Sequence, residues 1–324
     1  MNRPKPRVTK VLLERRARAL KQHIKAAVDG DGTGVHQARV ASRRLREAVP
    51  VLARGVKGSK AGRISRKMRR LTRALGTFRE ADVTLALLDE LATHDTLPRL
   101  ALEEVRRDII DERDRRRTSM LKRLETVNLS KLDRRLVTMA DALQQAEGEE
   151  WRKLLGTRLM KRAKALGAAV ADAGQMYAPE RLHTVRITVK KLRYGLEIAA
   201  ETGVRPAAAP VRSLKRAQDL LGRLHDFQVL ETHVKAVQAK PSEGGQAGNL
   251  EVMARAIEDE CRHLHGHYVA LITALTEVVD TTRRVVVPLI VRSSRSRRLP
   301  VKMTLATRTR RRAKTEPHAA SSRA

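Results

Sequence analysis

Two stretches of the sequence decide the fold: residues 35–46, VHQARVASRRLR, and residues 182–193, LHTVRITVKKLR. They align without a gap at an offset of 147 residues. A second pair of stretches, residues 75–83 (LGTFREADV) and 221–229 (LGRLHDFQV), aligns at an offset of 146. Because two separate blocks recur at nearly the same offset, the sequence predicts the duplication of a whole folding unit.

The first block of each pair predicts a helix with one apolar and one cationic side. At 3.6 residues per turn, His36, Arg39, Arg43 and Arg46 fall within an arc of about 80°. Small and apolar residues occupy the opposite side and explain how the helix packs. The second copy has the same arrangement, with His183, Arg186, Lys190 and Arg193 on one side and Arg44 and Lys191 at the edges of the two stripes.

A cationic stripe of this kind is unusual for a helix face that only contacts water. Solvated faces normally mix charges, because like charges four residues apart repel each other. Both copies of the cationic stripe contain like charges at this spacing and so retain the repulsion. The pattern therefore predicts a bound anion that compensates it. A histidine in a helix start is most often structural, but its recurrence in both stripes favours a contact with phosphate.

The composition predicts a polyanionic partner for the whole chain. The sequence has 68 Lys and Arg against 36 Asp and Glu, which gives a net charge of +32 over 324 residues. Aromatic residues make up only 2%, which leaves few rings to stack on bases, and Leu, Ala, Arg and Val dominate instead, which favours helices over sheets. The single cysteine excludes a disulfide framework within the chain. No secretory signal and no apolar run long enough to span a bilayer are recognisable, so we expect a soluble cytoplasmic protein.

Helical periodicity covers residues 8–276, interrupted by Gly, Pro and Asn, for example at Gly76, Asn128 and Gly222. The predicted fold is all-α, with repeat 1 over about 8–147, repeat 2 over about 151–276, and residues 277–324 as a short apolar segment and a tail. From Arg292 onward, basic residues alternate with Ser, Thr and Ala, which predicts a disordered tail that binds polyanions, including nucleic acid, weakly and without specificity.

The second block adds charges of both signs. Basic residues precede or follow its Leu-Gly pair, and carboxylates stand at Glu80, Asp82 and Asp226. Carboxylates at a helix start are ordinary partners of the helix dipole. Alternatively, they orient the arginines or help to hold a divalent cation that accompanies phosphate.

Other candidate sites are weaker. The glycine-rich loop at residues 30–34 matches no nucleotide-binding fingerprint, so we interpret it as a linker between helices. Cys261, His263, His265 and His267 cannot all converge from one helix, so we expect no metal site. No arrangement of nucleophile and base is recognisable, and we expect neither an enzyme nor a cofactor.

At these motifs the sequence resembles the CHAD family, the conserved-histidine α-helical domain. The matching segments are residues 36–46, 75–83, 183–197 and 214–226, and the resemblance extends over about residues 8–276. It implies two antiparallel four-helix bundles related by a pseudo-two-fold axis, with basic helices that face a central groove and bind inorganic polyphosphate. Similar proteins are associated with polyphosphate granules in prokaryotic cells.

The sequence departs from the family pattern at two positions. Glu80 stands where the family usually has Asp, and His225 where Asn is common, which weakens any claim about a defined ion site. Some relatives carry a triphosphate-hydrolysing domain with a Glu-x-Glu-x-Lys strand, and because no such stretch is present, that activity is not inferred.

We therefore predict non-catalytic binding of inorganic polyphosphate, with sequence-nonspecific nucleic-acid binding as the alternative. The predicted contacts are His36, Arg39, Arg43, Arg44, Arg46, Arg69, Arg70, Arg73, Arg79, His183, Arg186, Lys190, Lys191, Arg193, Lys215 and Arg216. The oligomeric state is not predicted.

Overall fold

A computed structural model describes residues 6–93, 97–240 and 247–295 of the chain. Within these ranges the backbone forms α-helices and one short 3-10 helix, and no strand. The first half contains α1 (Val8–Val28), α2 (Gly32–Leu52), α3 (Ala61–Leu91), α4 (Arg99–Glu125) and α5 (Leu129–Gln145). The second half contains α6 (Glu150–Ala173), α7 (Pro179–Glu201), η1 (Arg205–Ala207), α8 (Ala208–Gln238) and α9 (Ala247–Arg295).

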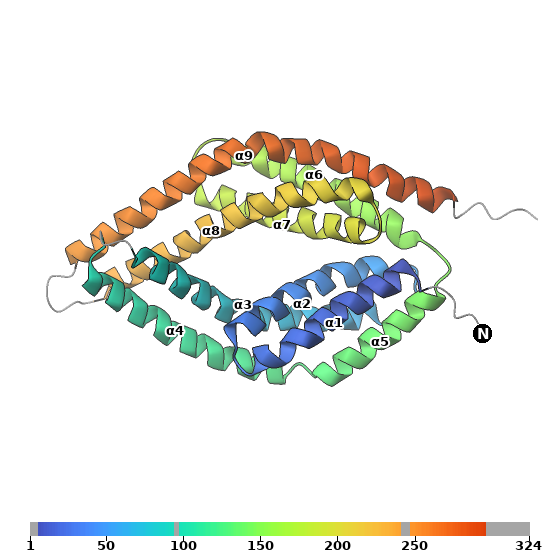
Figure 1. The fold of residues 1–324 in the computed structure, drawn as a ribbon, viewed down its shortest axis with the longest axis horizontal. Helices are drawn as coiled ribbons and strands as arrows, with labels where there is room; N and C mark the ends of the chain where they lie inside the picture. The colour runs from blue at the N-terminus through green and yellow to red at the C-terminus, as the bar shows by residue number, and fades with distance from the viewer. Residues whose placement is uncertain (1–5, 94–96, 241–246, 296–324) are drawn as a thin grey trace, which may run out of the picture.

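Each half is a bundle of antiparallel helices, and the two bundles lie one above the other in Figure 1. In the first, α1 packs on α2 and α5, and α3 packs on α2 and α4. In the second, α6 packs on α7 and α9, and α8 packs on α7 and α9. The predicted all-α architecture is confirmed. The common ancestry of the two halves stays a prediction from the two sequence blocks.

The fourth helix differs between the bundles. In chain order, α4 and α5 together correspond to the single long helix α9. The break between them lies at Asn128, whose side-chain Oδ1 accepts a hydrogen bond of 2.7 Å from the backbone N–H of Lys131. This N-cap satisfies one of the donors that a helix start leaves free, and the helix stop predicted at Asn128 is confirmed.

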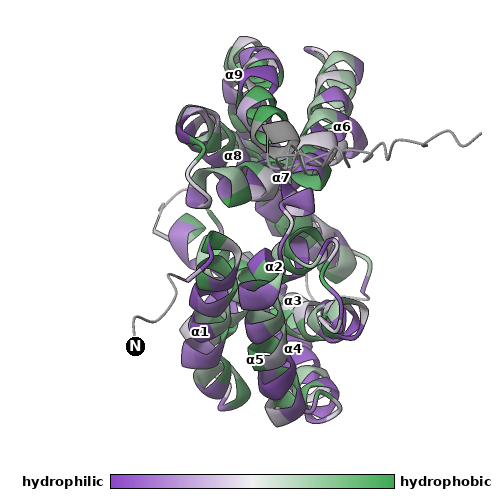
Figure 2. Ribbon diagram, turned by 90° about the vertical axis from the view of Figure 1, so that its right-hand side faces the viewer, coloured by the Kyte–Doolittle hydropathy of each residue, from purple (hydrophilic) through white to green (hydrophobic). Residues whose placement is uncertain are grey.

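Apolar side chains fill the inside of both bundles. On the cationic helices, Leu45 and Val49 of α2 and Leu192 and Leu196 of α7 are fully buried. Figure 2 shows hydrophobic and hydrophilic residues on different sides of the same helices, as such packing requires. The apolar side therefore fixes the direction in which each cationic side points.

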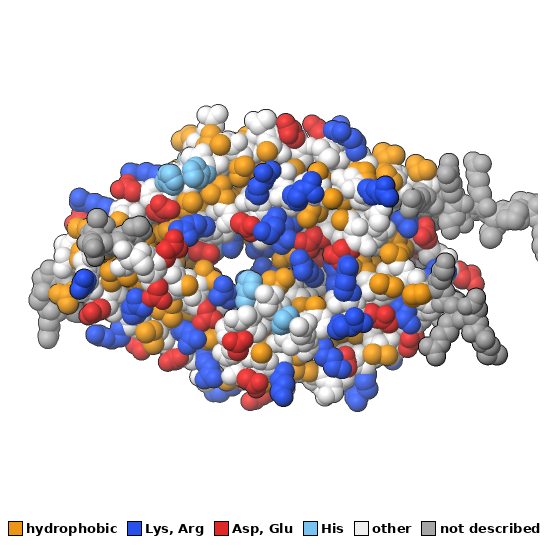
Figure 3. All heavy atoms as spheres, viewed as in Figure 1, with side chains coloured by type: hydrophobic (Ala, Val, Ile, Leu, Met, Phe, Trp, Pro, Cys, Tyr) orange, Lys and Arg blue, Asp and Glu red, His pale blue; other side chains and the backbone are white. Residues whose placement is uncertain are grey.

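The inner helices of the two bundles face each other. The helix α2 contacts α7, and α3 contacts α8, so each inner helix touches its counterpart, as a two-fold arrangement requires. Figure 3 shows an opening between the two bundles near the centre of the view, with histidine and basic side chains beside it. Among the described helices, none is long and apolar enough to cross a membrane.

The breaks predicted at Gly76 and Gly222 are wrong. Both residues lie inside long helices, since α3 and α8 each run without interruption for 31 residues. A glycine inside a helix costs only about 1 kcal/mol relative to alanine, and the apolar periodicity continues on both sides of each glycine. Glu80, Asp82 and Asp226 consequently lie in the middle of helices rather than at a helix start.

The helix α9 continues beyond residue 276, where the second repeat was predicted to end. Val285, Val286 and Leu289 are buried, and Gly156 of α6 leaves room for Val286, because a Cβ there would lie 3.3 Å from that side chain. The apolar segment is thus part of the second bundle. Residues 296–324, most of the predicted tail, lie outside the described residues.

Candidate anion-binding site

The two cationic helix faces meet between the bundles. Lys190 of α7 is surrounded by positive charge from both repeats: burial and, after it, the nearby charges of Arg186, Arg43 and Arg39 together lower the pKa of its ammonium group to about 7. The helices α2 and α7 therefore bring the two stripes into one group. We call the following residues the central cluster: His36, Arg39, Arg43, Arg79, His183, Arg186 and Lys190.

The histidines lie at the edge of this cluster. Burial lowers the pKa of His36, and the positive charges of Arg79 and Arg39 lower it further. The ring of His183 lies 5.1 Å from the ring of His225, measured between centroids. Burial, followed by the surrounding positive charges, lowers the pKa of His225 to about 4. An anion would reverse this effect, because it favours the protonated form of each ring.

The members of the central cluster form no ion pair within the described part of the chain. The Nε–H groups of Arg39 and Arg186, and Nδ1 of His36, are buried and have no hydrogen-bond partner among the described residues. A buried donor without a partner costs about 1–3 kcal/mol, and more when the group is charged. Arg39 and Arg186 occupy the same position in the two blocks, so both bundles present an unsatisfied guanidinium to the same place.

Of the three carboxylates of the second block, Asp226 lies beside this cluster, and the charge of Glu80 also reaches Arg39 and Arg186. Asp226 of α8 is near Arg186, Arg79 and Arg39, and its pKa is raised because burial outweighs the attraction of these charges. The partly buried Asp226 and the charge of Glu80, which is also paired with Arg116, cannot neutralise the seven cationic or protonatable groups of the cluster. The charge of the site thus remains strongly positive.

The other two carboxylates of the second block hold arginines of α4. Glu80 accepts a hydrogen bond of 2.9 Å from Arg116 Nη1, and Asp82 accepts one of 2.7 Å from Arg113 Nε. Of the roles considered for these acids, the orientation of arginines fits these contacts. In the described residues, no group of three His, Cys, Asp or Glu side chains is placed to hold a metal ion.

The outer part of each stripe is neutralised by acids. We call Arg44, Arg46 and Arg193 the outer arginines. Glu197 is buried and accepts hydrogen bonds from Arg193 Nη1 and, at 3.2 Å, from Arg44 Nε. Arg193 Nε also donates to Gln218 at 3.0 Å, and Arg46 lies 3.9 Å from Glu47. Their role in anion binding stays a prediction, but their charges already have partners.

The remaining predicted contacts are exposed side chains around the cluster. Within the described residues, no hydrogen bond or ion pair joins them to it. Lys215 forms an ion pair of 3.1 Å with Asp219 of the same helix. The others are Arg69, Arg70 and Arg73 on α3, Lys191 on α7, and Arg216 on α8.

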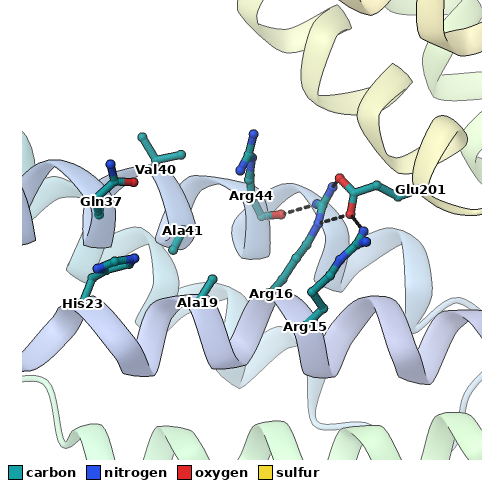
Figure 4. A pocket seen from close by; sticks show the side chains of 9 residues that line it. All are labelled: Arg15, Arg16, Ala19, His23, Gln37, Val40, Ala41, Arg44 and Glu201. Atoms are coloured by element: carbon teal, nitrogen blue, oxygen red, sulfur yellow. Dashed lines mark hydrogen bonds and ion pairs between the residues drawn. The ribbon is translucent and has the colours of Figure 1, made fainter.

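A cavity of about 470 Å³ lies beside the outer arginines, between α1, α2 and the end of α7. Figure 4 shows that Arg15 and Arg16 turn toward Glu201. The buried Arg16 donates to Glu201 Oε1 at 2.8 Å and to the backbone oxygen of Arg44 at 2.8 Å, and Arg15 pairs with the same carboxylate. Because its cations are paired internally, this cavity is less suited to an anion than the central cluster is. The contact instead fastens α1 to α7.

Further ion pairs join the bundles on both sides of the central cluster. Arg162 of α6 donates to Glu47 of α2 at 2.5 Å. At the other end, Arg223 of α8 bonds Glu90 of α3 with both terminal nitrogens, at 2.9 and 2.7 Å. These ion pairs between the bundles therefore lie on either side of the central cluster, whose own cations form no ion pair among the described residues.

Sequence reasoning did not include His225 and Tyr194 among the contacts. His225 aligns with Arg79 in the second block, so the duplication contained a signal for it. Tyr194 lies under the guanidinium of Arg193, 4.7 Å from the ring centroid, and its position next to Arg39 follows only from the approach of α7 to α2.

Comparison with known proteins gives matches at the level of family and fold. A family model for the CHAD domain matches residues 11–235. Two uncharacterized proteins of Mycobacterium tuberculosis, one from each of two strains, are 30% identical over 213 residues. The alignment covers 62% of this chain and 39% of each relative, so this chain matches less than half of their length.

Two solved structures have a similar fold. The crystal structure of the CHAD domain from the plant Ricinus communis aligns with 86% of this chain and 90% of its own, with a TM-score of 0.55 and 20% identity. The structure of PptA from Streptomyces chartreusis aligns with 88% of this chain and 99% of its own, with a TM-score of 0.51 and 12% identity. At these identities the likeness concerns the fold alone.

Proposed function

Because the chain belongs to the CHAD domain family, we propose that it binds inorganic polyphosphate at the central cluster without catalysing a reaction. One observation carries the proposal: Arg39 and Arg186, from equivalent positions of the two bundles, each bury an Nε–H that has no partner in the part of the chain that the structure describes. A phosphate chain between the bundles supplies acceptors to both.

Phosphate fits this site better than other anions do. Guanidinium groups form forked, charge-assisted hydrogen bonds with phosphate oxygens, and a lysine such as Lys190 adds a point charge. A linear polyphosphate has one negative charge at nearly every phosphorus, so it matches a row of cations without requiring bases. The scarcity of aromatic residues agrees with a ligand that has nothing to stack.

The sharpest test of this proposal is competition under increasing salt. We expect polyphosphate to remain bound at a salt concentration that releases duplex DNA, because half-buried guanidiniums are screened less than surface charges are. Binding would be measured by fluorescence anisotropy of labelled polyphosphate and labelled DNA. If salt displaces both ligands equally, the site is a generic cationic surface, and the nucleic-acid alternative gains support.

The tail requires its own control, because it is basic and binds any polyanion. The same titration on residues 1–295, which keep all of α9, separates the two contributions. We expect the truncated chain to keep most of its affinity for polyphosphate and to lose most of its affinity for DNA. We also propose that the protein associates with polyphosphate granules, which imaging of a fluorescent fusion in cells with and without polyphosphate would test.

A further inference from the structure

Arg152 has an unusual environment far from the central cluster. It lies in the first turn of α6, and only 6% of its surface is exposed. Its guanidinium lies over the ring of Trp151, with Cζ 4.6 Å from the ring centroid. The nitrogens Nε and Nη1 are buried and have no hydrogen-bond partner within the described residues. Nothing in the proposed function uses this side chain.

Glu149 only partly compensates this charge. Its Oε2 lies 2.9 Å from Arg152 Nε, but the two groups are not aligned for a hydrogen bond. The carboxylate side chain is 34% exposed and thus partly solvated. Nη1 has no acceptor in residues 6–93, 97–240 and 247–295. A cation in the first turn is also unfavourable, because it lies at the positive end of the helix dipole, which attracts anions. Arg152 is therefore a buried guanidinium with unused hydrogen-bond donors at a helix N-terminus.

A pocket of about 500 Å³ opens at this guanidinium. It is lined by Arg152, Arg205, Pro288 and the backbone turn formed by Gly203, Val204 and Pro206. No carboxylate is among these lining residues. Arg205 is exposed and forms no ion pair within the described part of the chain. The two lining arginines therefore give the pocket a charge that suits a doubly charged oxyanion.

We propose that this pocket is a second, separate anion site that takes a phosphate group between Arg152 and Arg205. The stacking of Arg152 on Trp151 holds the guanidinium plane in place, so its fork is oriented before the ligand arrives. Gly203 has a φ of +89° and no atom within 4 Å of a Cβ built there, which leaves space beside the turn. The end of α7 at Glu201, which precedes this turn, is about 16 Å along the helix from Lys190, since each helical residue advances about 1.5 Å. The group bound is either free phosphate or the end of a phosphate chain.

The chain provides its own probe for this site, because Trp151 is its single tryptophan. Titration of the full-length protein with inorganic phosphate should give a saturable change in tryptophan emission, whereas chloride at equal ionic strength should give none. Arg152→Lys keeps the positive charge but loses the forked guanidinium donors, so it should abolish the saturable change in emission. Arg205→Ala should weaken it about tenfold, and Arg212→Ala, an exposed arginine of α8 outside the pocket, should leave it unchanged.

The test is carried out in both the wild-type protein and the Arg39→Glu/Arg43→Glu variant. The emission change should persist in this variant, which separates the pocket from the central cluster and from the fate of the proposed function. In the same variant, the emission can be titrated with polyphosphate and with inorganic phosphate. If polyphosphate changes the emission at a lower concentration than phosphate does, the pocket binds the end of a phosphate chain. A change with phosphate alone indicates free phosphate. Either result supports the site.

Three outcomes would overturn this second site. The first is the absence of a saturable change with any phosphate ligand. The second is a change of the same size with chloride or acetate, which would indicate no selectivity for phosphate. The third is an unchanged titration in Arg205→Ala, a variant of an exposed residue that is expected to fold normally.

Discussion

The inner and outer parts of the same stripe have opposite surroundings. Arg43 and Arg46 are one turn apart on α2, and Lys190 and Arg193 are one turn apart on α7. Yet the central cluster is without ion pairs among the described residues, whereas Glu197 and Glu47 accompany the outer arginines. Each stripe therefore contains a candidate ligand site at its inner part and ion pairs with carboxylates at its outer part. The charge of the residues alone does not distinguish these two parts.

Reversing charge in the central cluster should have the largest effect on binding. We expect Arg39→Glu/Arg43→Glu, and equally Arg186→Glu/Lys190→Glu, to reduce polyphosphate affinity about a thousandfold, because two charge-assisted contacts of roughly 1.5–3 kcal/mol each are lost. Titration calorimetry measures the loss, and thermal unfolding followed by circular dichroism verifies the fold.

The matched control for this pair is Arg310→Glu/Arg311→Glu in the tail, which reverses the same number of charges. We expect it to change affinity several-fold at most. Equal losses from the cluster and the tail would refute a site between the bundles.

Removing an outer arginine should affect stability more than binding. Arg193→Met leaves Glu197 buried with one partner fewer, and breaking a buried pair typically costs about 3–5 kcal/mol. Arg43→Met removes a charge that has no ion pair among the described residues and that lies near Arg39 and Lys190, so stability should stay unchanged or increase slightly. Urea unfolding of the two variants measures the difference. If both lose the same amount, the distinction between inner and outer arginines has no energetic basis.

Binding should depend on pH through Lys190. Its pKa is about 7 in the free folded protein, against 10.5 for an ordinary lysine, so above pH 7 the unfolded chain holds this proton more tightly. The contribution of this group to stability therefore rises with pH between these two values. An anion favours the charged lysine, so binding takes up a proton above pH 7.

Polyphosphate affinity should consequently fall as pH rises above 7, by up to about tenfold per pH unit. Lys190→Arg should flatten the profile, because arginine keeps its charge throughout this range. The measurement is calorimetry between pH 6 and 9 in buffers of different ionisation enthalpy. A wild-type profile as flat as that of the variant would show that Lys190 is not part of the binding site.

The smallest effect on polyphosphate affinity is expected from substitution of an exposed cation that already has an ion-pair partner. Lys215 already contacts Asp219 and is largely solvated, so Lys215→Met should alter affinity less than about twofold, in line with the small energies of surface ion pairs. A loss of tenfold or more would extend the site along α8, beyond the central cluster.

The sequence was sufficient for the cationic stripes, the cap at Asn128 and the all-α architecture, because all three follow from local periodicity and spacing. It was insufficient at Gly76 and Gly222, where the helix continues through a residue that usually interrupts one. It also did not separate Arg43 from Arg44, whose partner Glu197 is 153 residues away and belongs to the other bundle. Such pairings depend on how α2 meets α7, and no local pattern encodes that approach.

The most direct test of one site between two bundles is the behaviour of the arginine Nε–H groups in NMR spectra. The resonances of Arg39 and Arg186, assigned through Arg39→Lys and Arg186→Lys, would be followed during titration with tripolyphosphate. Both should shift along a single saturation curve, while Arg193 Nε–H, bonded to Gln218, should stay in place. Separate curves for Arg39 and Arg186, or a shift of Arg193 as large as theirs, would contradict a shared central site.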